Sequence, residues 1–268
     1  MTISNIAVAG STGRMGRTLI EALAETEDLK LSAALEQPGN PLLSQDAGAF
    51  LGTPCGVSIS SNHIDALKTS DILIDFTRPA GTLAYLAVCR ELNIKMVIGT
   101  TGFTAAERTI IQDAANEIAI VFAPNMSIGV NVLFKLLEVA TAALQKGYDI
   151  EIIEAHHRHK VDSPSGTALR MGEIIAQVAN RQLDQVAIYG RQGHTGERTS
   201  DTIGFSTIRG GDIVGDHTAL FAGIGERIEI THKANSRKTF ATGALRAARF
   251  LATQKSGLFD MQDVSGLR

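Results

Sequence analysis

Short apolar runs alternate with amphipathic stretches through the first 125 residues. The runs Ile6–Gly10 and Leu29–Leu35 are mainly apolar and stop beside a glycine or a glutamate, as buried strands do. Between them Met15, Leu19 and Leu23 recur at helical spacing. The same alternation predicts further strands over 71–75, 95–98 and 118–121, and helices after 79 and over 104–115. Repeated strand–helix units indicate an α/β fold with a parallel sheet.

The pattern changes from residue 128 onward. The spacing predicts helices over 128–145 and 166–179, with a strand over 151–156 before the second of them. Three strand-like stretches follow at 203–209, 213–221 and 226–232, separated by glycine-containing breaks. In the last stretch Ile228 and Ile230 alternate with polar residues, so one face of that strand is expected to be buried. This part is predicted to be an α+β domain with a mixed open sheet, followed by a helix over 239–252.

A glycine-rich turn follows the first predicted strand and opens the first helix. It reads Gly10-Ser-Thr-Gly13-Arg-Met-Gly16, and glycine at such a turn lets backbone N–H groups approach a pyrophosphate. Glu36 ends the second strand twenty residues beyond Gly16, where this fold places a ribose-binding carboxylate. The alternative is a tight turn followed by an ordinary surface glutamate. Strand, glycines, helix and acid in register favour a Rossmann-type dinucleotide-binding domain.

The residue after Glu36 bears on the choice of cofactor. A site selective for NADP places a cation near the 2′-phosphate, whereas the carboxylate of Glu36 repels a phosphate. Gln37 is uncharged, and Arg14 is the nearby cation that can offset the carboxylate. We therefore expect NADH or NADPH, with a leaning to NADH or to dual use.

Polar and small residues follow several of the predicted strands. Thr77, Gly99, Thr101 and Asn125 all fall at carboxyl ends of parallel strands, the edge where such sheets bind ligands. Loops also use glycine, threonine and asparagine simply for turns, so each position alone has that alternative.

The segment 154–167 packs histidines and cations between a strand and a helix N-terminus. The side chains of Arg158 and Lys160, with the N–H groups of Gly166 and Thr167, predict a pocket for a small, multiply anionic substrate. Hydride addition to an unsaturated acid builds negative charge, which an ammonium or imidazolium can stabilise and then protonate. A zinc site on His157, His159 and Glu154 is an alternative, opposed by the flanking cations. For His159 taken alone, a structural histidine at the end of a strand is the favoured explanation.

Composition narrows the class of protein. The chain has 268 residues, 44% of them hydrophobic, and a net charge of −3, which gives no electrostatic case for nucleic acid. Its two cysteines, Cys55 and Cys89, suggest free thiols in a reducing compartment. No apolar run reaches the length of a membrane span. We expect a cytoplasmic protein that binds a small molecule.

Seven motifs together identify a family resemblance. The sequence resembles 4-hydroxy-tetrahydrodipicolinate reductase, also called dihydrodipicolinate reductase, of bacterial lysine and diaminopimelate biosynthesis. The likeness rests on segments spread over nearly the whole chain, namely 10–16, 75–79, 99–103, 125–131, 154–168, 209–217 and 236–240. The run from Glu154-x-His-His-x-x-Lys160 to Ser165-Gly-Thr is the most specific of them.

The resemblance implies an oxidoreductase that reduces 4-hydroxy-tetrahydrodipicolinate to tetrahydrodipicolinate with NAD(P)H and loses water. It implies His156 as proton donor or acceptor and Lys160 as a second catalytic acid. Contacts to the dicarboxylate substrate would come from His157, Ser165, Gly166 and Thr167. Cofactor contacts would come from Gly10, Ser11, Thr12, Gly13, Arg14, Met15, Glu36, Gly99, Thr100, Thr101, Ala123, Pro124, Asn125 and Met126. No metal is implied.

The resemblance also implies an organisation of the whole chain. The last helix would pack back on the nucleotide domain, which gives a dinucleotide-binding domain of 1–127 and 238–268 and a substrate-binding and oligomerisation domain of 128–237. The family is a homotetramer joined through the sheet of the second domain. Gln37 stands where NADPH-using members often have arginine, Met126 replaces a common phenylalanine, and Ser163 replaces a usual alanine.

Two other functions compete with the reductase. One is another imine or amino-acid dehydrogenase on the same scaffold, such as an aspartate dehydrogenase, which does not explain the spacing of the 154–167 segment. The other is a non-catalytic protein that senses NAD(P)H, which leaves the cation-rich pocket without a role.

Overall fold

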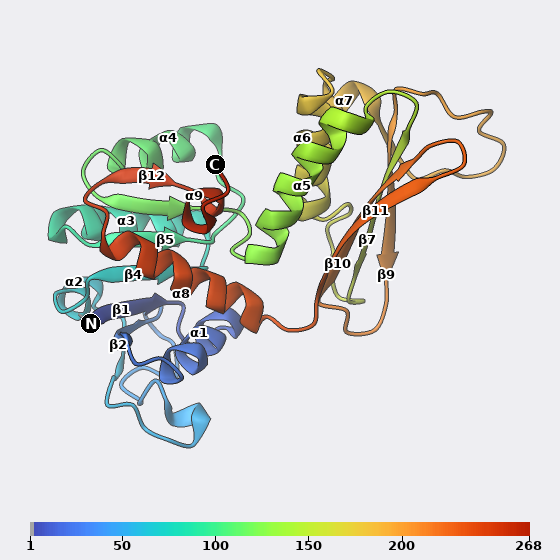
Figure 1. The fold of residues 1–268 in the computed structure, drawn as a ribbon. Coiled ribbons are helices and arrows are strands. Elements are labelled where there is room, and N and C mark those ends of the chain that lie inside the picture. Colours follow the sequence, from blue (N-terminus) through green and yellow to red (C-terminus); the bar gives the residue numbers. More distant parts are fainter. Residues whose placement is uncertain (1–2) are drawn as a thin grey trace. The chain divides into compact units, whose positions relative to one another are not determined.

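The computed structural model describes residues 3–268, which form two compact units. One unit comprises the described residues up to Ile128 together with Arg237–Arg268, and the other comprises Gly129–Ser236. In Figure 1 the first unit is coloured blue to green with a red C-terminal part, and the second runs from light green to orange. The second unit is therefore an insertion within the sequence of the first.

The first unit contains a seven-stranded sheet in the order β12-β6-β5-β4-β1-β2-β3, and every paired strand is parallel. The strand order reverses between β1 and β4, which is the position where open parallel sheets bind ligands. The parallel α/β fold predicted from the alternating pattern is thus confirmed. The strands are β1 Ser4–Ala9, β2 Leu29–Leu35, β3 Ile59–Ser60, β4 Ile72–Asp75, β5 Lys95–Ile98, β6 Ala119–Phe122 and β12 Gly257–Phe259.

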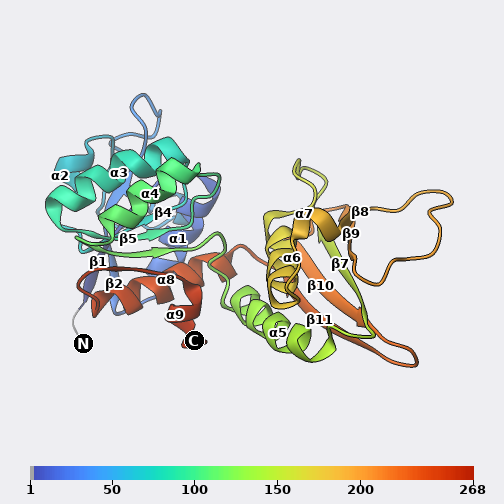
Figure 2. The same cartoon turned by 90° about the horizontal axis from the view of Figure 1, so that it is seen from above.

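Helices cover both faces of this sheet, as Figure 2 shows. In β1, Ile6 and Val8 pack in a cluster with residues of α1 and α8, whereas Ala7 and Ala9 pack on the other side with residues of α3 and α4. A strand buried on both faces reads as a continuous apolar run, which explains the pattern in the sequence. The helices are α1 Arg14–Ala24, α2 His63–Leu67, α3 Pro79–Leu92, α4 Ala105–Ala114, α8 Lys238–Ala252 and α9 Met261–Ser265, with a 3₁₀ turn at Ala49–Leu51.

The second unit contains a five-stranded sheet in the order β11-β10-β7-β9-β8. Strand β7 is antiparallel to β10 and parallel to β9, so the sheet is mixed, as predicted. Its elements are α5 Ile128–Leu144, β7 Asp149–His156, α6 Gly166–Val178, α7 Leu183–Val186, β8 Ala187–Tyr189, β9 Ile203–Arg209, β10 Gly215–Ala222 and β11 Arg227–Ala234.

Helices cover one face of this mixed sheet only. Ile152 of β7 and Phe221 of β10 are fully buried in a cluster with residues of α5 and α6. The alternate positions Ile153, Leu220 and Ile208 point to the opposite face, where Ile208 is 51% exposed and the other two are partly exposed. The sheet therefore has one open, partly apolar face.

The expectation of a buried face on the last strand is wrong for Ile228. Its side chain is 42% exposed, and Ile230 is only partly buried. Strand β11 is an edge strand paired with β10 alone, so its apolar side chains have neighbours on one side only. Alternation correctly predicted which side chains share a face but not how well that face is covered.

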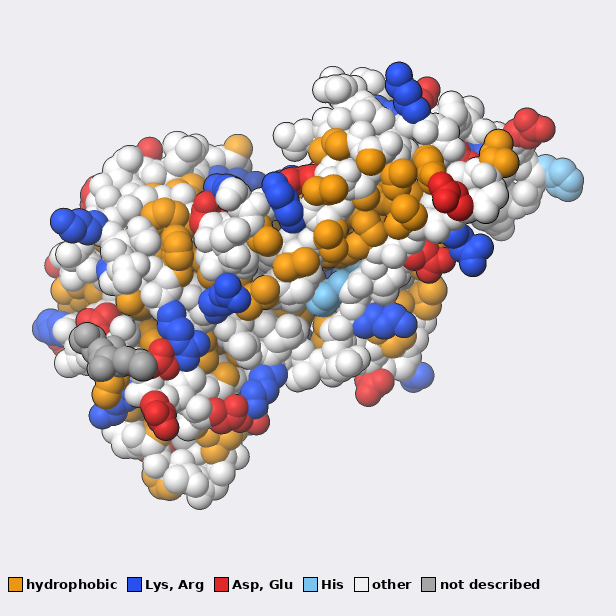
Figure 3. Space-filling model, viewed as in Figure 1, with side chains coloured by type: hydrophobic (Ala, Val, Ile, Leu, Met, Phe, Trp, Pro, Cys, Tyr) orange, Lys and Arg blue, Asp and Glu red, His pale blue; other side chains and the backbone are white. Residues whose placement is uncertain are grey.

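Helix α5 is apolar on more than one side. Val130, Leu133 and Leu137 are buried against the sheet, whereas Val132 and Leu136 are exposed. Hydrophobic side chains gather over this helix in the space-filling view of Figure 3. None of the helices within residues 3–268 combines the length and the apolar character that crossing a membrane requires.

Candidate active site

The glycine-rich loop joins the end of β1 to the start of α1 in the first unit. Gly10 has a φ of +62°, a left-handed conformation that favours glycine. A Cβ on Gly16 would lie 2.2 Å from the carbonyl oxygen of Gly10, so the helix start can pack on the loop only without a side chain. These are the two positions where the predicted phosphate-binding turn needs glycine.

Glu36 lies beside this loop, as the sequence spacing predicts. Its Oε2 accepts a hydrogen bond from Thr12 Oγ1 at 2.6 Å, and its Oε1 accepts one from the backbone N–H of Gln37 at 2.9 Å. Asn40 donates to Thr12 Oγ1 at 3.2 Å, and no sequence motif pointed to this residue. The carboxylate is therefore held at the loop by short contacts before any ribose binds.

Polar groups without partners gather at the carboxyl edge of the sheet. The hydroxyl oxygens of Ser11, Thr77 and Thr100 are buried and have no hydrogen-bond partner in the structure. They follow β1, β4 and β5, which are neighbouring strands. Buried polar groups are nearly always satisfied, so orphaned hydroxyls here fit a polar ligand such as a dinucleotide. A Cβ on Gly99 would stand 2.3 Å from the ring of Phe76, so this loop also needs glycine.

The other predicted cofactor residues lie on the same unit in different environments. Arg14 and Thr101 are exposed, whereas Ala123 and Met126 are buried after β6. Asn125 accepts a hydrogen bond from the N–H of Ser127 at 2.9 Å. Met126 belongs to the hydrophobic cluster under α8, so its exchange for phenylalanine is a core substitution in this chain.

The histidine-rich segment of the second unit connects β7 to α6. His156 is the last residue of β7, and its side chain is buried. The chain then turns, with the N–H of Lys160 donating to the carbonyl of His157 at 3.1 Å. Lys160 Nζ lies 2.8 Å from Asp162 Oδ1 in the same loop. His156, His157 and Lys160 therefore come from one strand end and the turn after it.

Helix α6 begins at Gly166 with Ser165 as its N-cap. Ser165 Oγ accepts a hydrogen bond from the N–H of Ala168 at 3.2 Å, which satisfies one N–H of the first turn. An added Cβ on Gly166 would meet no atom within 4 Å, so there is open space at the helix start. A helix N-terminus with space in front of it suits a carboxylate.

Glu154 is the most heavily hydrogen-bonded side chain of this region and is only 1% exposed. Its oxygens accept from His156 Nδ1 at 2.6 Å, from both terminal nitrogens of Arg209 at 2.8 and 2.9 Å, and from the N–H of Ser165 at 3.0 Å. Burial opposes its ionisation, but the hydrogen bonds from Arg209 and His156 outweigh burial and lower its pKa to about 2. Glu154 is thus an ionised, fully engaged carboxylate.

This arrangement bears on the zinc alternative. Both oxygens of Glu154 are occupied by His156 and Arg209 and are not presented to His157 and His159. Among residues 3–268, no three histidine, cysteine or acidic side chains are grouped as a metal site would need. The geometry therefore gives the zinc reading no support.

His217 joins the site and was not identified from the sequence. Its Nε2 lies 2.9 Å from Ser165 Oγ, and its ring meets that of His156 edge to face at 5.0 Å. Burial lowers the pKa of His217 to about 3, so the ring is neutral at physiological pH. Burial also lowers the pKa of His156, which Glu154 opposes only in part. The only sequence signal for His217 was its place in the segment 209–217.

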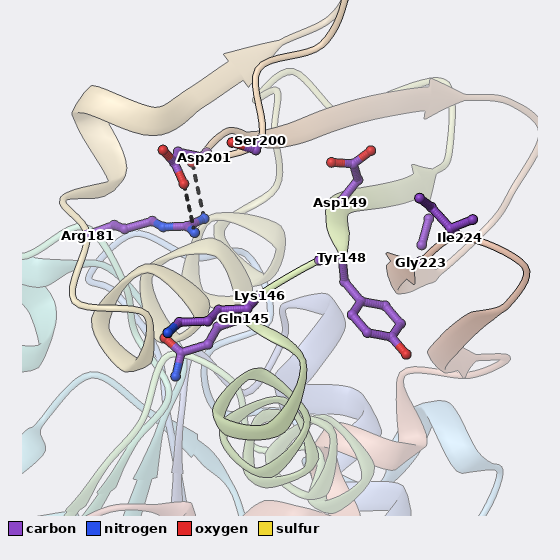
Figure 4. Close-up of a pocket in the computed structure, with 11 residues that line it drawn as sticks. Gln145, Lys146, Tyr148, Asp149, Arg181, Ser200, Asp201, Gly223 and Ile224 are labelled. Atoms are coloured by element: carbon purple, nitrogen blue, oxygen red, sulfur yellow. Dashed lines mark hydrogen bonds and ion pairs between the residues drawn. The ribbon is translucent and has the colours of Figure 1, made fainter.

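A separate hollow of about 660 Å³ lies at the other end of β7. Lys146, Tyr148 and Asp149 line it before and at the start of that strand, and Arg181 pairs there with Asp201 (Figure 4). His156 stands at the opposite end of β7, so this hollow does not contain the predicted site residues.

Comparisons with known proteins cover nearly all of the chain. Family models for the N-terminus and the C-terminus of dihydrodipicolinate reductase match residues 4–126 and 129–264. A protein of Nitrosomonas eutropha named 4-hydroxy-tetrahydrodipicolinate reductase is 76% identical over 268 residues, covering 100% of both chains. A protein of the same name from Nitrosospira multiformis is 63% identical over the same length, again with 100% of both chains covered.

A solved structure resembles the fold of the whole chain. It is a dipicolinate-bound dihydrodipicolinate reductase from Paenisporosarcina sp. TG-14, with a TM-score of 0.77 and 26% sequence identity. The match covers 98% of this chain and 99% of that one.

Proposed function

This chain belongs to the dihydrodipicolinate reductase family, and we infer that it is an NAD(P)H-dependent oxidoreductase that reduces 4-hydroxy-tetrahydrodipicolinate to tetrahydrodipicolinate. The product gains a hydride and a proton, and one water molecule is lost. The reaction belongs to diaminopimelate and lysine biosynthesis. The observation that carries this function on the structural side is the β7–α6 connection, where His156, Lys160 and an open helix N-terminus occur together.

The loop and the helix start divide the chemistry between them. The first-turn N–H groups at Gly166 and Thr167, with His157 beside them, suit the substrate carboxylates. Lys160 is the proton donor in this proposal, because its ammonium ion carries a proton that the carbon next to the hydride acceptor requires. His156, neutral and bonded through Nδ1 to Glu154, keeps its Nε2 lone pair for positioning the substrate or passing a proton.

The first unit provides the cofactor site in this proposal. A reduced nicotinamide supplies the hydride when bound. Gly10 and Gly16 let the loop pack closely against the start of α1. No side chain caps the first turn of that helix, so its N–H groups suit the phosphates, and the hydroxyls of Ser11 and Thr100 offer further hydrogen bonds. Met15, Gly13, Pro124 and the other predicted positions complete the proposed set.

We propose that the enzyme prefers NADH or uses both cofactors, because Glu36 stands at the position expected for the carboxylate that binds the ribose. Thr12 and the N–H of Gln37 hold its carboxylate in place, and a 2′-phosphate would meet this negative charge. Gln37 is exposed and brings no positive charge to oppose it.

Replacing Gln37 with arginine should raise the ratio of kcat/KM for NADPH to that for NADH by about tenfold, the value of one charge-assisted hydrogen bond. The measurement is initial rates of oxidation of each cofactor with enzymatically generated substrate. Gln112→Arg, which adds the same charge on the exposed side of α4, should leave the ratio unchanged. An unaltered ratio in Gln37→Arg would show that another residue sets the preference.

A panel of substrates separates this function from its two alternatives. We expect rapid NAD(P)H oxidation with 4-hydroxy-tetrahydrodipicolinate and at most a trace with oxaloacetate plus ammonia, the reaction of an aspartate dehydrogenase. A larger rate with the second mixture would favour the amino-acid dehydrogenase. Tight cofactor binding without oxidation by any substrate would instead indicate a sensor of NAD(P)H.

We further propose that the enzyme is a cytoplasmic homotetramer assembled through the open face of the five-stranded sheet. This face carries Ile153, Leu220 and Ile208, and Thr218 and Thr231 pair across it at 2.9 Å. A sheet face with exposed apolar side chains gains stability when a second copy covers it. The two free cysteines suit a reducing compartment.

Leu220→Lys should reduce the mass in solution, measured by light scattering after gel filtration, from that of a tetramer to that of a smaller species. The buried charges would make association unfavourable by several kcal/mol per interface. Ile110→Lys, an equivalent change at an exposed site on α4, should leave the mass unchanged. A tetramer that persists with Leu220→Lys would rule out this face as the interface.

A further inference from the structure

We propose that Glu154 and Arg209 are positioning residues that hold the ring of His156 and the loop of Lys160 in one hydrogen-bonded array. This inference rests on the proposed roles of His156 and Lys160 and adds the two groups that orient them. Neither Glu154 nor Arg209 was singled out for this purpose by motif or by spacing.

The register of the mixed sheet builds the array. Glu154 and His156 are two residues apart on β7, so their side chains lie on the same face of the strand. Strand β9 runs parallel beside β7 with Arg209 paired to His156 and Thr207 paired to Glu154. The guanidinium therefore reaches across to the carboxylate, and Thr207 Oγ1 lies 3.3 Å from it.

Glu154 fixes the orientation and the tautomer of His156. The 2.6 Å contact between its Oε2 and His156 Nδ1 requires a proton on Nδ1, because the carboxylate is ionised and can only accept. The lone pair of the neutral ring is then on Nε2. Gly215 leaves room at that nitrogen, since a Cβ there would already stand 3.0 Å from it.

Arg209 connects this pair to the lysine loop. Its forked guanidinium binds both oxygens of Glu154, and its Nη2 also donates to the carbonyl of Asp162 at 2.6 Å. The carboxylate of Asp162 in turn holds Lys160 Nζ at 2.8 Å. One guanidinium thus ties the ends of both β7 and β9 to the loop that carries the proton donor.

The charges around His156 make Arg209 an electrostatic control as well as a geometric one. Glu154 favours the protonated ring, whereas Arg209 and Lys160 oppose it, and the neutral His217 packs against its side. Without Arg209, the buried carboxylate of Glu154 would lose its cationic partner and keep only His156 and the neutral donors Ser165 and Thr207. It would then favour the protonated form of His156. Without the charge of Glu154, the imidazolium would lose its one anionic partner.

The test is the titration of His156 by nitrogen-15 NMR, which reports both the tautomer and the pKa without depending on turnover. Wild-type protein should show the proton on Nδ1. Arg209→Met should raise the pKa of His156, and Glu154→Gln should lower it and mix the tautomers. If the ion pair between Glu154 and Arg209 served only stability, the two substitutions would not shift the pKa of His156 in opposite directions.

Arg198→Met is the matched control. Arg198 is as well buried as Arg209, at 18% against 21% side-chain exposure, and it also bridges β7 carboxylates, those of Asp149 and Glu151. It lies at the far end of the strand, so its loss should cost stability and leave the titration of His156 unchanged. Unchanged titration in both Glu154→Gln and Arg209→Met would overturn the proposal.

Turnover supplies the second measurement. Arg209→Met and Glu154→Gln should each lower kcat by about tenfold to hundredfold, a part of what a positioned proton-transfer group contributes, with little change in the KM for NADH. Arg209→Lys keeps the charge and loses the fork, and it should recover part of the loss. If Arg209→Met or Glu154→Gln does not fold, the wild-type protein and Arg209→Lys still test the proposal. A proton on Nε2 of wild-type His156 would contradict the hydrogen-bonded array.

Failure of the proposed function and failure of this inference have different signatures. Full turnover in His156→Asn would show that His156 has no role in the reaction. The tautomer and the pKa of His156 in the wild-type protein could still be as this inference predicts. If His156→Asn loses activity as expected but the titration of His156 does not change in Glu154→Gln or Arg209→Met, the proposed function stands. Only the positioning role of Glu154 and Arg209 is then refuted.

Discussion

Lys160→Ala should lower kcat by about two to four orders of magnitude, the contribution of a positioned proton donor. Its side chain is partly buried, at 21% exposure, and the loop that carries it leads to the N-terminus of α6. The fold should hardly change, because the ion pair with Asp162 is partly exposed and such pairs contribute about 0–1 kcal/mol. The KM for NADH should also stay near that of the wild type, since the proposed cofactor residues belong to the other unit.

Lys160→Arg tests charge separately from proton donation. Arginine keeps the positive charge but does not release its proton, so it should restore substrate binding more than kcat. Lys146→Ala, at the opposite end of β7, is the control and should behave as the wild type. Steady-state kinetics with both cofactors and fluorescence titration of NADH provide the measurements. Turnover that survives Lys160→Ala would remove the lysine from the reaction.

Gly243→Ala should destabilise the first unit by about 1–3 kcal/mol, although glycine to alanine in an open helix is stabilising by about 1 kcal/mol. Gly243 lies within α8, and a Cβ there would stand 1.8 Å from the carbonyl oxygen of Met126. Backbone faces it, so neither a rotamer nor a flexible side chain can relieve the overlap. Helix and loop must move apart.

The same change should raise the KM for NADH severalfold, because the displaced loop 123–126 carries four of the proposed cofactor positions. Thermal or urea unfolding and initial-rate kinetics measure the two effects. Thr242→Ala, on the exposed side of the same helix, should be close to neutral in both. A Gly243→Ala protein as stable as the wild type would mean that α8 and this loop are not in close contact.

Most long elements of the fold were predictable because their patterns are local. The run Leu29–Leu35 and the alternation of strands with helices were enough for the parallel sheet, and β2 has these bounds. Glu36 could be placed beside the glycine loop because both follow neighbouring strands of one βαβ unit. The short elements β3, β8 and α7 have two to four residues, too few for a period to be detected.

The remaining features depend on which distant segments become neighbours. The pairing of Glu154 with Arg209 requires β9 to lie parallel beside β7, and no local pattern states which strands pair. The contact of Ser165 with His217 likewise joins two elements 52 residues apart. The exposure of Ile228 follows from its edge strand, which alternation does not reveal. Sequence reasoning thus identified the residues proposed to contact the substrate more readily than the residues that orient them.

The division of the first unit into two stretches of sequence has a consequence for biosynthesis on the ribosome. Its core unites Ile6 and Leu19 with Ala244 and Leu251, and the last strand, β12, pairs with β6. The ribosome makes the N-terminal part first, so this core cannot close until α8 and β12 have also been synthesised. The inserted unit has all of its strands earlier and can mature first. A nascent chain halted before Lys238 would carry an intact glycine loop on an unfinished nucleotide-binding unit.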